Sequence, residues 1–151
     1  MEALNRDKAA TILNRIMELE LAGVVRYTHY SLMIYGYNRI PIVDWLRAQA
    51  TEGLAHAQRA GEMITQLGGH PSLGIGPLLE SHEHDVGAIL RESLKHENES
   101  CAAYYDLLEL AQGRSVLLED YAREMIVAEE THADHVNKML RSPGELSAFR
   151  S

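Results

Sequence analysis

The residues of this sequence best suited to chemistry are glutamates and histidines at helical spacing. Glu129-Glu-Thr-His132 places a carboxylate and an imidazole three residues apart, and Glu52-Gly-Leu-Ala-His56 places the same pair four residues apart. In a helix, both spacings bring the two side chains to one face. Two more glutamates, Glu20 and Glu97, interrupt stripes of apolar residues. Together these four carboxylates and two imidazoles predict a site for two metal ions.

The expected burial of these side chains explains why a metal is needed. A carboxylate buried without a partner is strongly destabilising or takes up a proton. Four glutamates balance the charge of two Fe²⁺ ions. Carboxylates also accept hard Fe³⁺, while imidazoles help to hold Fe²⁺. We therefore expect two iron ions, with manganese as the alternative metal.

An internal repeat supports a shared site. Four residues recur with identical types 77 positions later in the chain: Leu13, Glu20, Tyr27 and Glu52 recur as Leu90, Glu97, Tyr104 and Glu129. The histidines depart from this rule, because His132 lies one position before the equivalent of His56. The repeat predicts two helical hairpins related by a pseudo-twofold axis, each supplying half of the ligands.

The elements that must position these residues are four long helices, since apolar residues recur every three or four positions in four segments. These segments run from the cap residue Asn5 to about Gly36, from about Pro41 to Gly68–Gly69, from about Asp85 to Gly113, and from the cap residue Ser115 to the Ser-Pro-Gly sequence at 142–144. The first and third links are short, whereas the link from His70 to about His84 is long enough to cross the bundle. This order predicts one all-α domain over residues 1–151, an antiparallel four-helix bundle with a long crossover between helices two and three.

Composition narrows the classes of function. Acidic residues outnumber basic ones by 22 to 14, giving a net charge of −8, which argues against binding to nucleic acid or to an anionic membrane. No apolar run approaches the roughly 20 residues that cross a bilayer. The charged N-terminus has no apolar stretch typical of a signal peptide, and the single cysteine cannot form an internal disulfide. We expect a soluble, cytoplasmic protein.

Over nearly its whole length the chain resembles the bacterioferritins of the ferritin-like superfamily. The resemblance is carried by Glu20-Leu-Ala-Gly-Val-Val-Arg-Tyr27, by Glu129-Glu-Thr-His132, and by His56-Ala-Gln-Arg-Ala followed by Gln66-Leu-Gly-Gly-His-Pro-Ser-Leu73. It implies a ferritin-like fold and a di-iron ferroxidase that oxidises Fe²⁺ with O₂ or peroxide. It also implies iron storage or detoxification in a homo-oligomeric shell.

The resemblance also implies a role for each residue of the site. Carried over by position, Glu20 and Glu97 would be terminal ligands, and Glu52 and Glu129 would bridge the two irons. His56 and His132 would each bind one iron. Tyr27 would donate a hydrogen bond to a ligand glutamate across the core.

Three departures from the family pattern limit what is carried over. The extra residue between Glu52 and His56 predicts a π-bulge or kink at residues 52–56, because a wider turn would give both side chains the direction of the Glu129–His132 pair. The alternative is a regular α-helix with an asymmetric site, in which Glu52 or His56 is displaced from the metal. The haem-ligating methionine of the family falls among residues 53–55, which are Gly, Leu and Ala, so haem is not expected. Too few residues follow Pro143 for a substantial fifth helix. We therefore leave the shell at 12 or 24 subunits, with a dimer as the smaller alternative.

Two other functions stay open on the sequence alone. The first is a di-iron or di-manganese peroxidase or catalase, in which the metal stays in place and peroxide turns over. The second is a non-enzymatic helical bundle that acts through protein contacts, which leaves six ionisable residues on core stripes unexplained. Two other histidines are expected outside the site, His96 off its stripe and His135 as a surface residue or a neighbour of the ligands.

Overall fold

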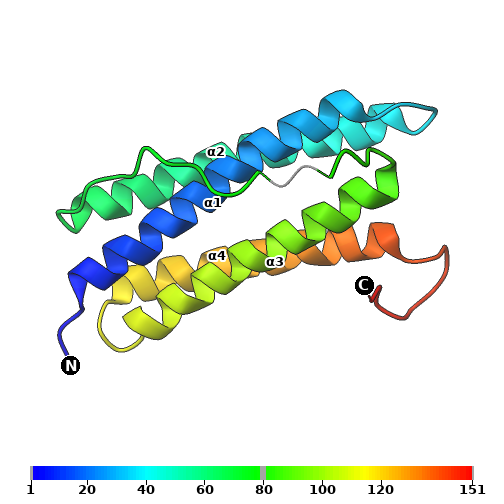
Figure 1. The fold of residues 1–151 in the computed structure, drawn as a ribbon. Helices are drawn as coiled ribbons and strands as arrows, with labels where there is room; N and C mark the ends of the chain where they lie inside the picture. The colour runs from blue at the N-terminus through cyan, green and yellow to red at the C-terminus, as the bar shows by residue number, and fades with distance from the viewer. Residues whose placement is uncertain (1, 79–80, 151) are drawn as a thin grey trace.

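The computed structural model describes residues 2–78 and 81–150. Within these ranges the chain forms four α-helices and no strand, so the predicted all-α class is confirmed (Figure 1). The helices are α1 (Arg6–Met33), α2 (Arg39–Gln66), α3 (Val86–Ala111) and α4 (Val116–Leu140). None of them is long and apolar enough to cross a membrane.

Three of the helices begin at the polar residues that the sequence suggests. The side chains of Asn5, Asp85 and Ser115 each accept a hydrogen bond from the backbone N–H three residues later, at 3.1, 3.1 and 3.2 Å. Such caps satisfy amide groups that have no partner within the helix. α2 begins at Arg39 rather than at Pro41, and α1 ends at Met33, before Gly36. Gly36 lies in the turn with a φ of 101°, a conformation that favours glycine.

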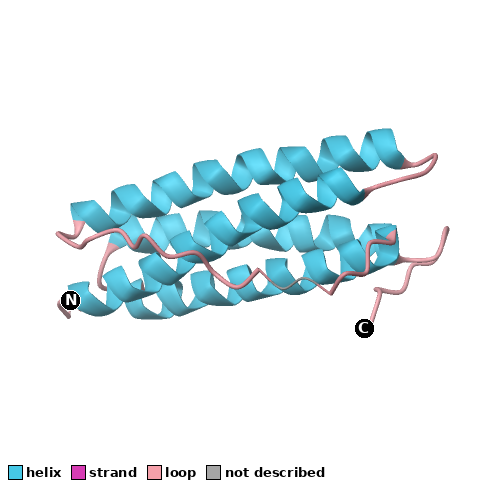
Figure 2. Cartoon of the chain, turned by 45° about the horizontal axis from the view of Figure 1, so that its top comes forward, coloured by secondary structure: helices cyan, strands magenta, loops and turns pink. Residues whose placement is uncertain are grey.

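The helices form two antiparallel hairpins, α1 with α2 and α3 with α4, joined by one long crossover (Figure 1). The crossover runs along the outside of the bundle, so α2 and α3 point the same way (Figure 2). Asn14 of α1 holds its first part in place: its side chain donates to the carbonyl of His70 at 3.2 Å and accepts from the amide of Ser72 at 2.8 Å. Further on, the amide of Gly76 donates to the carbonyl of Glu18 at 2.9 Å. This topology is that of the ferritin-like bundle.

The middle of the bundle separates two apolar clusters. The larger cluster contains residues of all four helices, and its most buried members include Leu13, Ile64, Tyr104 and Leu118. The smaller cluster, around Tyr27, Leu46 and Ile89, draws its members from the first three helices and from Ile34, which follows α1. Among the described helices, α1 packs against α2 and α3, and α3 packs against α4. No Cα atoms of α2 and α4 lie within 8 Å of each other, so the bundle is more open on that side.

The inward face of α2 differs from the one expected from the sequence. Spacing of three or four residues predicts inward positions 49, 52, 56, 60, 63 and 67 on this helix, but the buried residues are Val43, Leu46, Ala50, Gly53, Ala57, Ala60 and Ile64. Small residues predominate in this stripe, which lets α1 and α2 pack closely. Glu52 and His56 therefore lie at the edge of the α1–α2 interface. His56 still points inward, with 14% of its side chain exposed, whereas Glu52 is 40% exposed and does not lie on the buried stripe as expected.

Candidate metal centre

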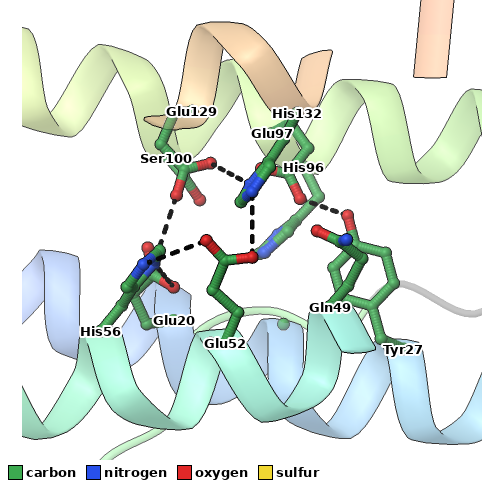
Figure 3. A pocket seen from close by; sticks show the side chains of 12 residues that line it. Glu20, Tyr27, Gln49, Glu52, His56, His96, Glu97, Ser100, Glu129 and His132 are labelled. Carbon is green, nitrogen blue, oxygen red and sulfur yellow. Dashed lines mark hydrogen bonds and ion pairs between the residues drawn. The ribbon is translucent and has the colours of Figure 1, made fainter. Parts of the chain in front are cut away.

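All six side chains expected to bind metal meet in one small polar cavity at the middle of the bundle (Figure 3). Its free volume is about 10 Å³, about the space of one water molecule. Each helix contributes to its wall: α1 Glu20, α2 Glu52 and His56, α3 Glu97, and α4 Glu129 and His132. The carboxylates of Glu20, Glu97 and Glu129 are buried, with residue exposures of 6%, 5% and 2%.

Two groups of ligand atoms in this cavity are compact enough to hold a metal ion. One consists of Glu20, His56 and Glu129, and the other of Glu97, Glu129 and His132; within each group the ligand atoms lie within 4.8 Å of one another. Glu129 belongs to both groups. It approaches His56 through Oε1, at 3.7 Å from Nδ1, and His132 through Oε2, at 3.9 Å from Nδ1. A carboxylate with one oxygen toward each group is suited to bridge two cations.

Glu52 belongs to neither group. Its side chain is 40% exposed. One carboxylate oxygen is 3.1 Å from Nε2 of His132, and the other is 3.5 Å from Nε2 of His56. The two rings are nearly parallel, with an interplanar angle of 16° and centroids 6.4 Å apart. Glu52 thus contacts both imidazoles at the nitrogen that faces away from the buried carboxylates.

The predicted π-bulge or kink at residues 52–56 is wrong. α2 is an uninterrupted α-helix from Arg39 to Gln66. Glu52 and His56 nevertheless reach the same cavity, because the long glutamate side chain approaches from the edge of the helix. Because α2 stays regular, the site is asymmetric: Glu52 does not occupy the position that Glu129 occupies on α4.

Two tyrosines connect the hairpins through crossed hydrogen bonds. The hydroxyl of Tyr27 on α1 donates to Glu97 on α3, as expected from the sequence. The hydroxyl of Tyr104 on α3 donates to Oε1 of Glu20 on α1 at 3.0 Å. These are the repeat partners, so the pseudo-twofold relation extends to the groups that hold the buried carboxylates in place. Burial is the main reason that the pKa of each tyrosine is raised, so both remain hydrogen-bond donors.

The electrostatics of the cavity call for a cation. Burial raises the pKa of Glu129 far above its ordinary value, and the adjacent carboxylates of Glu97 and Glu20 raise it further. Burial also disfavours ionised Glu97, but hydrogen bonds from Glu129, His132 and Tyr27 outweigh it and lower the pKa to about 2. The pair therefore retains a proton at neutral pH. Oε2 of Glu129 has no hydrogen-bond partner. A divalent cation would replace the proton and satisfy this oxygen, so these residues fit a metal site.

One residue of the cavity wall was not expected there. His96 is buried, with 4% exposure, and its ring lies edge-on to Tyr27 at a centroid distance of 6.2 Å. The ring fits because Gly23 lies opposite: a Cβ atom at position 23 would be only 2.8 Å from Nε2 of His96. Nδ1 has no hydrogen-bond partner, and burial lowers the pKa of the ring, which favours its neutral form. The signal in the sequence was Gly23, a residue without a side chain on an otherwise apolar stripe.

The other side chains near the site do not join it. His135 is exposed on α4, in agreement with its expected surface position. Cys101, on α3, is partly buried and burial raises the pKa of its thiol, as befits a small apolar residue. Arg59 on α2 pairs with Glu124 on α4 at 2.8 Å and connects the two helices across the open side of the bundle.

The chain belongs to the ferritin-like domain family, whose model matches residues 10–143. No curated protein matches the chain by sequence.

Solved structures share the fold at low sequence identity. A ferritin-like diiron-carboxylate protein from Bacillus anthracis superimposes with a TM-score of 0.85 at 21% identity, covering 90% of this chain and 97% of the other. A dodecameric thioferritin from Bacteroides fragilis, described as bacterioferritin-related, gives a TM-score of 0.85 at 20% identity, with coverage of 91% and 86%. The bacterioferritin of Desulfovibrio desulfuricans, which has a diiron site, gives 0.77 at 23% identity, with coverage of 89% and 79%. The expected resemblance to bacterioferritins and related diiron proteins is confirmed at the level of fold.

Proposed function

We propose that this protein is a di-iron ferroxidase, which oxidises Fe²⁺ with O₂ or peroxide and serves iron storage or detoxification. The observation that carries the proposal is the position of Glu129, a buried carboxylate shared by two groups of potential ligands. No purely structural role explains why a bundle core would keep three buried glutamates beside two histidines. Two divalent cations would compensate this charge.

The proposed ligand roles follow the two groups. Glu20 and His56 hold one iron, Glu97 and His132 hold the other, and Glu129 bridges them. Tyr27 and Tyr104 fix the terminal carboxylates through their hydrogen bonds, and such outer contacts typically tune metal affinity. Two iron atoms supply one electron each, so O₂ with two protons yields H₂O₂, and H₂O₂ with two protons yields two H₂O. Iron is the substrate in this reaction, with manganese as the alternative metal.

We also propose that the protein assembles into a closed homo-oligomer. Large apolar side chains are exposed together at the α1–α2 turn: Leu32 at 57% on α1, Tyr37 at 107% in the turn and Ile40 at 76% on α2. Apolar surface of this kind commonly marks contacts between chains. A shell of 12 or 24 subunits would support storage, whereas a dimer would support an enzyme that only oxidises iron or consumes peroxide.

Iron oxidation by the metal-free protein tests the proposal. Fe²⁺ is added anaerobically in steps up to several equivalents per chain, and O₂ or H₂O₂ is then mixed in while the Fe³⁺ absorbance is followed. We expect a fast phase whose amplitude saturates at two Fe²⁺ per chain. Slower oxidation beyond two equivalents, with the iron retained by the assembly on size-exclusion chromatography, would support storage. No fast phase with either oxidant would contradict the ferroxidase proposal, and rapid peroxide turnover by a permanently bound metal pair would favour the peroxidase or catalase alternative.

A further inference from the structure

We infer that Glu52 orients both imidazoles of the metal centre from outside and does not bridge the two metals. This inference rests on the proposed two-metal site and changes one of the roles that the family resemblance implies. It makes Glu129 the single protein bridge.

The contacts of the two imidazoles place their nitrogens in different surroundings. Nδ1 of His56 faces the core, at 3.4 Å from Oε2 of Glu20, and Nδ1 of His132 faces Oε2 of Glu97 at 3.8 Å. Nε2 of each ring faces Glu52 instead, at 3.5 and 3.1 Å. A carboxylate that accepts from an Nε2–H group fixes the ring orientation and leaves the Nδ1 lone pair free to bind a metal. One glutamate does this for both rings.

The geometry of α2 explains why Glu52 does not reach the bridging position. On α4 the bridging candidate Glu129 precedes His132 by three residues, and the residue three before His56 is Gly53. A Cβ atom at Gly53 would lie 3.3 Å from the backbone oxygen of Glu20 and 3.4 Å from Val24, so α1 leaves little room for a side chain there. Glu52, one residue earlier, is rotated by about 100° around the helix.

Exposure distinguishes the two carboxylates in the same way. The side chain of Glu52 is 40% exposed and that of Glu129 is 3% exposed. A rotation of 100° carries Glu52 away from α1 and toward the open side between α2 and α4. From there it reaches the outer nitrogens of the imidazoles and not the buried centre between the two groups.

The charge and the hydrogen-bonding capacity of Glu52 can be separated by two substitutions. Glu52→Gln removes the negative charge and keeps one acceptor oxygen, which can serve one of the two Nε2–H groups, while its NH₂ group cannot accept from the other. Glu52→Ala removes the charge and both acceptors. Glu130→Gln, which changes an exposed carboxylate on α4 beside the site, is the matched control. Co²⁺ is titrated into each metal-free full-length protein by calorimetry at one pH, and the visible Co²⁺ bands are recorded.

An orienting role predicts that all four proteins bind two Co²⁺ per chain. The affinity of Glu52→Gln, which still serves one ring, should fall about threefold, and that of Glu52→Ala should fall about tenfold, the lower end of the range for groups that support metal ligands. Equal and large losses of Co²⁺ affinity in Glu52→Gln and Glu52→Ala, or binding of only one Co²⁺ per chain by both variants, would show that the charged carboxylate binds metal. Either result would overturn the inference. Unchanged affinity in Ala would overturn it as well.

A structure of the cobalt-loaded wild type gives a test that needs no variant. Glu52 oxygens at about 2 Å from a Co²⁺ ion, the usual ligand distance for carboxylates, would refute the orienting role. Oxygens that stay on Nε2 of the histidines, outside coordination distance, would support it. Failure of the wild type to bind two Co²⁺ would instead contradict the proposed two-metal function.

Discussion

Replacement of Glu129 by glutamine should stabilise the metal-free protein at neutral pH while weakening its metal site. The carboxylate is 2% exposed, and burial together with Glu97 and Glu20 raises its pKa. At pH 7 the folded wild type keeps a proton that an unfolded glutamate has released. Glutamine has a similar shape and no proton to take up, so the folded variant avoids this cost.

The size of the effect follows from proton linkage. For each pH unit above 4.5, the ordinary pKa of glutamate, the free energy of unfolding of the wild type falls by about 1.4 kcal/mol. This holds as long as the pKa of Glu129 in the folded protein lies above the pH of the measurement. Between pH 4.5 and pH 7 this amounts to about 3 kcal/mol. Because the folded pKa is raised, the contribution of Glu129 is fully favourable below pH 4.5 and is lost as pH rises. The advantage of Glu129→Gln should therefore be near zero at pH 4.5 and about 3 kcal/mol at pH 7.

Thermal unfolding of chelator-treated protein between pH 5 and pH 8, followed by circular dichroism, measures this difference. About 3 kcal/mol corresponds to a rise in Tm of roughly 9 °C for a chain of this size. All samples need the same protein concentration, because assembly makes Tm depend on it. Glu130→Gln, beside Glu129 but exposed, should show no such pH dependence. A variant that is no more stable than the wild type at pH 7, or an advantage independent of pH, would refute the electrostatic argument.

Two further substitutions test other contacts of the site. Tyr27→Phe removes the hydrogen bond to Glu97, so Co²⁺ affinity measured by calorimetry should fall about tenfold; unchanged affinity would mean that the bond does not support the ligand. Gly23→Ala places a Cβ 2.8 Å from His96, so urea unfolding should show a loss of about 1–2 kcal/mol, which reflects the cost of a forced core rearrangement. The loss should disappear in a His96→Ala background, and a loss of equal size in both backgrounds would place the strain elsewhere.

The sequence predicts the helices and the composition of the site well because both depend on local patterns. Asn5 and Ser115 are caps in the structure as expected, and Asp85, expected near the start of its helix, is a cap as well. The 77-residue repeat also carries over into three dimensions, where Tyr27 contacts Glu97 and Tyr104 contacts Glu20. Periodicity suffices to place each tyrosine on the face of its glutamate, since a residue seven positions from another on a helix faces the same side, whereas the hydrogen bond of Tyr27 was implied by the family resemblance.

What could not be predicted depends on how closely the helices approach. The buried face of α2 contains Ala50, Gly53, Ala57 and other small residues. Because these residues are only weakly hydrophobic, the buried stripe of α2 is difficult to recognise in the sequence. The rotation of Glu52 away from the bridging position follows from that face. His96 enters the cavity only because Gly23 on another helix leaves space for its ring, a relation between helices that no single segment reveals. The expected π-bulge failed for the same reason, because an edge position already gives Glu52 enough reach.

The most direct test of the two-metal centre is a crystal structure of the protein loaded with iron or manganese, with anomalous scattering used to locate the metals. We predict two anomalous peaks per chain, roughly 3.5–4 Å apart. One should lie between Glu20 and His56, the other between Glu97 and His132, and both within coordination distance of Glu129. A fully loaded crystal with a single peak, or with Glu129 bound to neither metal, would contradict the account.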